Sequence, residues 1–189
     1  MTVLTIAPAA ATLIAAAAGA ACKLYDNGVD VAGWHDKSWQ LETSKLLVAL
    51  FMMLFLLTSW TATFIFGTYA IICNLQQSAD THFWQVAGII PAISAICLAA
   101  AGSLPSLADA GLAVAGGAFV VVESALYPEE MSWRKWIGRA LTAVITGIIA
   151  VIASKRREWP PWISLLAAWT AGYNTLSVIW TRPAAEPRS

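Results

Sequence analysis

Six apolar segments, each long enough to form a helix, run through the 189-residue chain. They cover residues 3–22, 46–73, 86–104, 110–127, 137–154 and 161–181. None alternates polar and apolar residues as a barrel strand would, so helices are the structure that satisfies their backbone groups in lipid. Only 12% of the residues are charged, too few to cover the surface of a chain that is 59% hydrophobic. The sequence therefore predicts an all-α fold: a polytopic integral membrane bundle of six, or else four or five, transmembrane helices in one domain over residues 1–189.

The segment 46–73 is the clearest predicted span. Its 28 residues would reach about 42 Å as one helix, which implies tilt, or an end that projects into the headgroups, in a bilayer whose hydrocarbon core is about 30 Å thick. The segment 3–22 has the length of a signal peptide, but no basic residue precedes it. We predict a retained helix there, with a cleaved signal as the alternative.

Two polar stretches separate or follow the apolar segments. Residues 23–45 are predicted to form an interfacial connector with a turn at Asn27-Gly28, and residues 182–189 a short polar tail. Trp34 and Trp39 suit the headgroup level at which tryptophan gathers.

The segment 137–154 carries basic clusters at both ends. The fifteen uncharged residues between Arg139 and Lys155 would cover only about 22 Å as a helix. The segment is therefore predicted to cross as a short helix that either thins the bilayer or is sheltered by neighbouring helices. If all six segments span, the basic residues divide five against six between the two sides, which gives no orientation.

Small residues recur every three or four positions along the last two segments. The predicted packing face consists of Ala140, Ala143, Gly147, Ala150, Ser154, Ala168 and Gly172. Such stripes let helix backbones approach closely, which is a main source of helix association in lipid. One interpretation is that the two helices simply pack on each other. Because the segment 110–127 adds Gly111, Ala115 and Gly116, we also predict a homo-oligomer.

Three polar residues lie in or beside apolar segments: Asp109, Glu123 and Asn174. Ser106 and Asp109 match the S-x-x-D capping box that opens a helix. Glu123 lies on the same helical face as Asp109, because fourteen residues at 100° each leave about 40°. It either pairs with a basic residue after the helix or lines a water-filled interior. Asn174 can donate a hydrogen bond across a helix interface.

The sequence favours neither an enzyme nor a cofactor-binding protein. The three cysteines have no CxxC spacing and the two histidines stand alone, so no metal site is predicted. A formal net charge of zero without a basic patch makes nucleic acid an unsuitable partner. The predicted partner is the lipid bilayer.

From about Gly111 onward the chain resembles a family of small phage holins. The motifs are "GLAVAGGAF", the basic "SWRKW" before a short span, a basic turn before "WPPW", and "AAWTAGY", within about residues 107–182. The resemblance implies a bacterial cytoplasmic membrane protein that oligomerises and permeabilises that membrane. Holins act through packing faces, so no residue role carries over.

Three functions follow as hypotheses. The first is a holin-like pore, with Asp109, Glu123 and Asn174 facing its lumen. The second is a small ion or solute channel or transporter, in which Glu123 and Asp109 bind a cation or relay a proton. The third is a structural subunit of a larger membrane complex.

Overall fold

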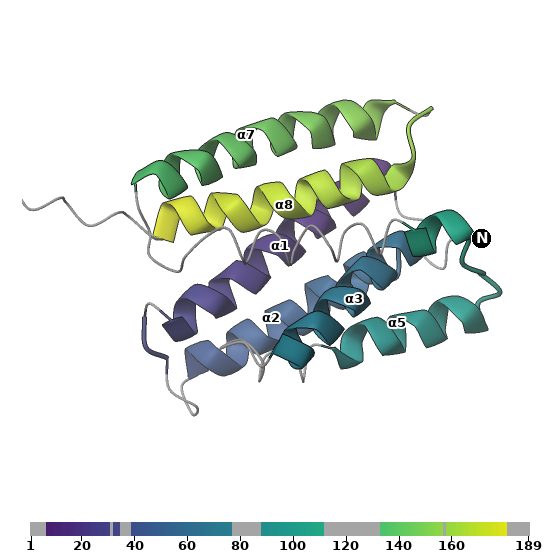
Figure 1. Ribbon diagram of the computed structural model, residues 1–189, viewed down its shortest axis with the longest axis horizontal. Helices are drawn as coiled ribbons and strands as arrows, with labels where there is room; N and C mark the ends of the chain where they lie inside the picture. Colours follow the sequence, from purple (N-terminus) through teal and green to yellow (C-terminus); the bar gives the residue numbers. More distant parts are fainter. Residues whose placement is uncertain are drawn as a thin grey trace, which may run out of the picture. The chain divides into compact units, whose positions relative to one another are not determined.

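The protein is all-helical wherever its structure is described (Figure 1). The computed structural model describes residues 7–30, 32–34, 39–76, 88–111, 133–156 and 158–180. The predicted all-α class is confirmed: these residues form helices and connections and contain no strand. The chain divides into two compact units, one of residues 1–11 and 49–128 and one of residues 12–48 and 129–189.

Three of the helices that the structure describes are long and apolar enough to cross a membrane. The described helices are α1 (Pro8–Asp30), α2 (Trp39–Leu56), α3 (Trp60–Gln76), α5 (Ile89–Ala100), α7 (Trp133–Lys155) and α8 (Pro161–Trp180). The candidate spans are α1 over Pro8–Val29, α2, and α7. The 12 residues of α5 reach only about 18 Å, short of a hydrocarbon core of about 30 Å. The chain is thus a helical membrane protein, while six spans stay a prediction.

The predicted single span over 46–73 is wrong, because the chain breaks between α2 and α3. Thr58 and Ser59 interrupt the helix: their backbone N–H groups turn back to Phe55 and Leu56, at 3.1 and 3.2 Å. The Thr58 hydroxyl also donates to the Phe55 carbonyl at 2.6 Å, and the Thr63 hydroxyl to the Leu56 carbonyl at 2.9 Å. The N–H groups and the hydroxyls together give the last carbonyls of α2 their hydrogen bonds, so the break forms inside an apolar run.

The predicted connector over 23–45 is also largely helical. The helix α1 continues to Asp30 and α2 starts at Trp39, so the turn predicted at Asn27-Gly28 is wrong. Gly28 serves packing instead, because a Cβ there would overlap the ring of Trp34. The chain reverses after the helix at Gly33, whose φ of 62° suits glycine.

The doubly basic segment forms a longer helix than predicted. The 23 residues of α7 begin at Trp133 and would reach about 34 Å, enough to cross a bilayer. The Trp136 indole donates to the Val178 carbonyl of α8 at 3.1 Å, which ties the added turn to the neighbouring helix. The length of α7 therefore removes the need for bilayer thinning.

In the first unit, α3 packs against α5 and the end of α2. The rings of Phe55 and Phe66 meet edge to face at 5.6 Å, and the Ser94 hydroxyl lies 3.3 Å from the Met53 sulfur. After α5 the chain turns at Gly102, whose φ of 75° places it in the left-handed region. The following Ser103 accepts a hydrogen bond from the Trp60 indole at 3.0 Å.

In the second unit, α7 and α8 form an antiparallel hairpin. Trp136 meets Val178 at one end, and a Cβ built on Gly147 would lie 3.9 Å from that of Ala171 farther along. The bulky residues of α7 point away from this seam. Their exposed fractions are 57% for Leu141, 60% for Val144, 55% for Ile148 and 44% for Ile152. This face is suited to lipid.

Candidate functional site

The helices α1 and α8 of the second unit approach each other at two glycines. A Cβ built on Gly19 would overlap the carbonyl oxygen of Trp169, and one built on Gly172 would overlap that of Ala16. Each glycine thus lies directly on the backbone of the other helix. Only residues without a side chain permit so close an approach.

This close approach brings a basic residue of α1 onto α8. The Lys23 ammonium lies 5.2 Å from the centre of the Tyr173 ring, within the range of a cation–π contact. It also forms an ion pair with Asp26, one turn along α1. The exposed fractions of the two side chains are 9% and 19%, so the pair is largely buried.

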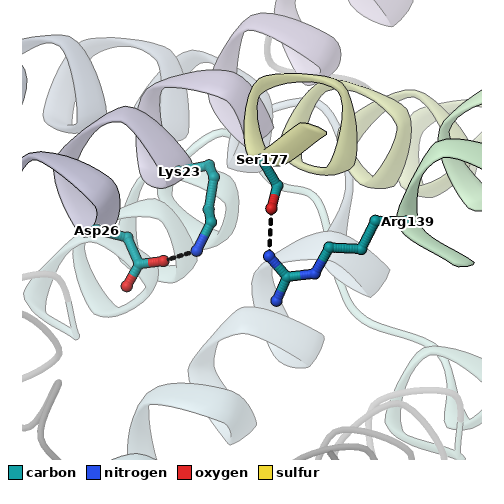
Figure 2. Close-up of polar contacts among 4 residues, drawn as sticks. All are labelled: Lys23, Asp26, Arg139 and Ser177. Carbon is teal, nitrogen blue, oxygen red and sulfur yellow. Dashed lines mark hydrogen bonds and ion pairs between the residues drawn. The ribbon is translucent and has the colours of Figure 1, made fainter. Parts of the chain in front are cut away.

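A second basic residue reaches α8 from α7. The Arg139 guanidinium donates a hydrogen bond to the hydroxyl of Ser177, a residue with no exposed surface. Figure 2 shows Arg139 extending toward Ser177 and the Lys23 ammonium directed at Asp26. Tyr173 and Ser177 are four residues apart and therefore neighbours on one face of α8. Lys23 and Arg139 accordingly contact adjacent positions of that face.

Asn27 adds a buried amide next to this group. It is 2% exposed, and its side-chain nitrogen has no hydrogen-bond partner within the part of the chain that the structure describes. It follows Lys23 by four residues, which places both on one face of α1. We call Lys23, Asp26, Asn27, Arg139, Tyr173 and Ser177 the polar cluster.

The charges of the polar cluster lie within helices rather than at their ends. If Pro8–Val29 and α7 cross the membrane, Lys23 is about 7 Å and Arg139 about 8 Å from the middle of its own helix. The hydrocarbon core extends about 15 Å to each side of its midplane. Ionisable groups at such depth are expensive and typically mark solute or ion pathways. The cluster holds two cations and one carboxylate.

The predicted packing face is occupied by the chain's own helices. Ala150 and Ala168 are buried, Ala140 and Ala143 half-buried, and Ser154 donates to the Val151 carbonyl of α7. Gly147 faces α8 and Gly172 faces α1. A homo-oligomer stays a prediction that depends on the segment 110–127. Gly111 has open space around it, and Ala115 and Gly116 lie outside the described residues.

The predicted polar residues Asp109, Glu123 and Asn174 do not belong to the polar cluster as defined above. Asp109 belongs to the first unit and Asn174 to the second. Glu123 lies outside the described residues. The Asn174 side-chain amide donates to the Thr170 carbonyl of its own helix at 2.9 Å, not across a helix interface. Their predicted role in a lumen stays a prediction.

Asp109 forms the capping box that the sequence predicts. Its carboxylate accepts hydrogen bonds from the Ser106 backbone N–H at 2.8 Å and the Ser106 hydroxyl at 2.7 Å, while its own N–H donates to that hydroxyl at 3.2 Å. The Thr61 hydroxyl of α3 donates to the same carboxylate. Desolvation raises the pKa of Asp109, but the hydrogen bonds from Thr61 and Ser106 outweigh it and hold the pKa below its ordinary value of 3.8.

This lowered pKa predicts a pH-dependent tether between α3 and the helix after Ser106. The carboxylate contributes stability above its ordinary pKa, and the contribution disappears as the pH falls through the lower folded-state value. At pH 6 we expect the unfolding midpoint of Asp109→Asn to lie below that of the unsubstituted protein. At pH 3 we expect the gap between the two midpoints to be smaller. Thermal unfolding in detergent across this range measures the gap, and a gap that is constant with pH would contradict the tether.

Sequence reasoning missed the polar cluster because it assigned Lys23 and Asp26 to a connector. The signal was present in their spacing of three residues, which pairs opposite charges on a helix, and in the four-residue spacing of Tyr173 and Ser177. The prediction of a short span places Arg139 at its end, whereas α7 starts six residues earlier at Trp133.

The described residues contain no group of three or more histidine, cysteine or acidic side chains that could hold a metal ion. The chain matches no protein-family model, no curated protein and no solved structure.

Proposed function

We propose that this protein is a small membrane channel or transporter whose solute or ion passes through the polar cluster. One observation carries the proposal: Lys23 and Arg139 contact α8 inside a helical unit, and Asp26 forms an ion pair with Lys23 there.

The physical argument concerns the cost of such charges. Moving an ion from water into a low-dielectric interior costs several kcal/mol, and a buried ion pair is often no more stabilising than apolar residues of the same volume. Packing α1, α7 and α8 together requires none of these charges, because the glycine contacts already bring the backbones close. Charges that packing does not require are best explained by a charged or polar permeant.

Proteoliposomes test the proposal. We expect the purified chain to carry acetate faster than protein-free liposomes do, measured as swelling in potassium acetate by stopped-flow light scattering, with valinomycin added to carry the potassium. Arg139→Gln removes the guanidinium charge and is expected to slow the protein-dependent swelling at least about tenfold, since one hydrogen bond to a charged group contributes about 1.5–3 kcal/mol. Arg156→Gln is the matched control, because Arg156 is 62% exposed and pairs with Glu158 outside the cluster. Swelling no faster than in protein-free liposomes, or equally fast in Arg139→Gln, would contradict the proposal.

A holin-like pore in the bacterial cytoplasmic membrane is the second candidate. The observation that favours it is the wide apolar face of α7, on which Leu141, Val144 and Ile148 are all more than half exposed. Such a pore would be large and unselective, so the same liposomes would release entrapped carboxyfluorescein. Selective swelling without dye release supports the channel or transporter. A structural subunit of a larger complex would produce neither signal.

A further inference from the structure

We propose that the polar cluster binds a singly charged oxyanion between Lys23 and Arg139. This inference rests on the proposed function, since it names the chemical class of the permeant, but binding can be measured whether or not transport occurs.

The first step is the charge balance of the cluster. Asp26 neutralises one cation, Lys23, by their ion pair. Arg139 meets a neutral partner, the Ser177 hydroxyl, and within the described residues it forms no ion pair. The cluster therefore keeps one positive charge on the half-buried Arg139 guanidinium, where an unpaired ion is more costly than in water. A single negative charge would balance it.

The second step is the surplus of hydrogen-bond donors. A lysine ammonium has three donors, an arginine guanidinium five, and an asparagine amide two. The acceptors that face them are the Asp26 carboxylate and the Ser177 hydroxyl, and the buried Asn27 nitrogen has no partner among the described residues. A ligand that brings several acceptor oxygens would satisfy these donors.

The third step is geometry. Lys23 contacts Tyr173 and Arg139 contacts Ser177, adjacent positions on one face of α8. The two cations can thus bind the same small ligand. The planar guanidinium matches the paired oxygens of a carboxylate or a phosphodiester, both of which carry one negative charge. A cation is excluded as ligand by the positive charge of the cluster.

Anion-dependent stability of the full-length chain in detergent tests the site. The unfolding midpoint would be followed by tryptophan fluorescence at constant ionic strength, with acetate titrated against gluconate, a bulkier carboxylate. We expect saturable stabilisation by acetate, at least about tenfold weaker affinity in Arg139→Gln, and unchanged affinity in Arg156→Gln. Asp26→Asn is expected to change the acetate affinity in the opposite direction. It removes the carboxylate that competes with acetate, so acetate should bind more tightly.

The source of the oxyanion is decided by a second titration with phosphatidylglycerol, whose phosphodiester carries one negative charge. Stabilisation by acetate identifies a free solute, and stabilisation by phosphatidylglycerol alone identifies a lipid headgroup. Either result supports the site if the ligand stabilises Arg139→Gln less than the unsubstituted chain. The site is refuted if neither ligand stabilises the protein, if Arg139→Gln binds as tightly as the unsubstituted chain, or if Asp26→Asn binds more weakly. Binding without swelling of the proteoliposomes would refute the proposed transport function and leave the anion site intact.

Discussion

Replacing Gly172 with alanine is expected to force α1 and α8 apart and to lower the free energy of unfolding by about 3 kcal/mol, the upper end of the cost of overpacking. The added methyl group would overlap the Ala16 carbonyl of α1. A backbone carbonyl within a helix has no rotamer by which to move away, so the helices themselves must shift. Unfolding in mixed micelles of increasing dodecyl sulfate content, followed by tryptophan fluorescence, measures the loss.

The matched control is Gly138→Ala on α7. A Cβ at Gly138 has open space around it, so the same substitution should be neutral or should stabilise the helix by about 0.5–1 kcal/mol. The two substitutions are therefore expected to have opposite signs. Equal effects of the two substitutions would show that α1 and α8 do not meet at Gly172.

Asp26→Ala is expected to destabilise the second unit by about 3 kcal/mol, because it leaves the Lys23 ammonium buried without its carboxylate. The Tyr173 ring would remain as its partner, and a cation–π contact offsets only about 1–2 kcal/mol. The same unfolding titration measures the effect. A second change, Lys23→Met, made together with Asp26→Ala, should recover most of the stability by removing the isolated charge.

The chain contains its own control for this prediction. Lys45 and Glu42 form an ion pair at the same three-residue spacing, but their side chains are 39% and 58% exposed. Glu42→Ala is therefore expected to change the free energy of unfolding by less than about 0.5 kcal/mol. A loss in Asp26→Ala no larger than that in Glu42→Ala would mean that the buried pair is as well solvated as the surface pair.

The all-α membrane class could be predicted from the sequence because it depends on composition and segment length. Lipid offers no hydrogen bonds to the backbone, so long apolar runs must be helical wherever they pack. The bounds of 161–181 were predicted within one residue of α8, since Pro160-Pro161 permits a helix to begin but not to continue back through it. The capping box of Ser106 and Asp109 was predictable for the same reason: it is local.

The errors arose where a local signal had more than one structural solution. The dipeptide Asn27-Gly28 is typical of a turn, yet here it is helical and Gly28 makes room for the Trp34 ring. The apolar run over 46–73 showed no obvious stop, yet the hydroxyls of Thr58 and Thr63 satisfy the carbonyls at a break. In both places one contact joins residues six or seven positions apart, Gly28 with Trp34 and Leu56 with Thr63, which no pattern of adjacent residues reports.

By itself, the sequence determined that this protein is helical and belongs in a membrane, and which residues are small enough to line its helix contacts. Only the tertiary structure decided which helices those small residues join: Gly172 meets α1, and Gly147 meets α8. It also decided that Lys23 and Arg139, 116 positions apart, contact adjacent positions of α8. The physical reason is that apolarity and helix formation depend on residues near one another in the chain. A charged cluster instead forms where helices pack together, and which helices pack together cannot be inferred from local sequence.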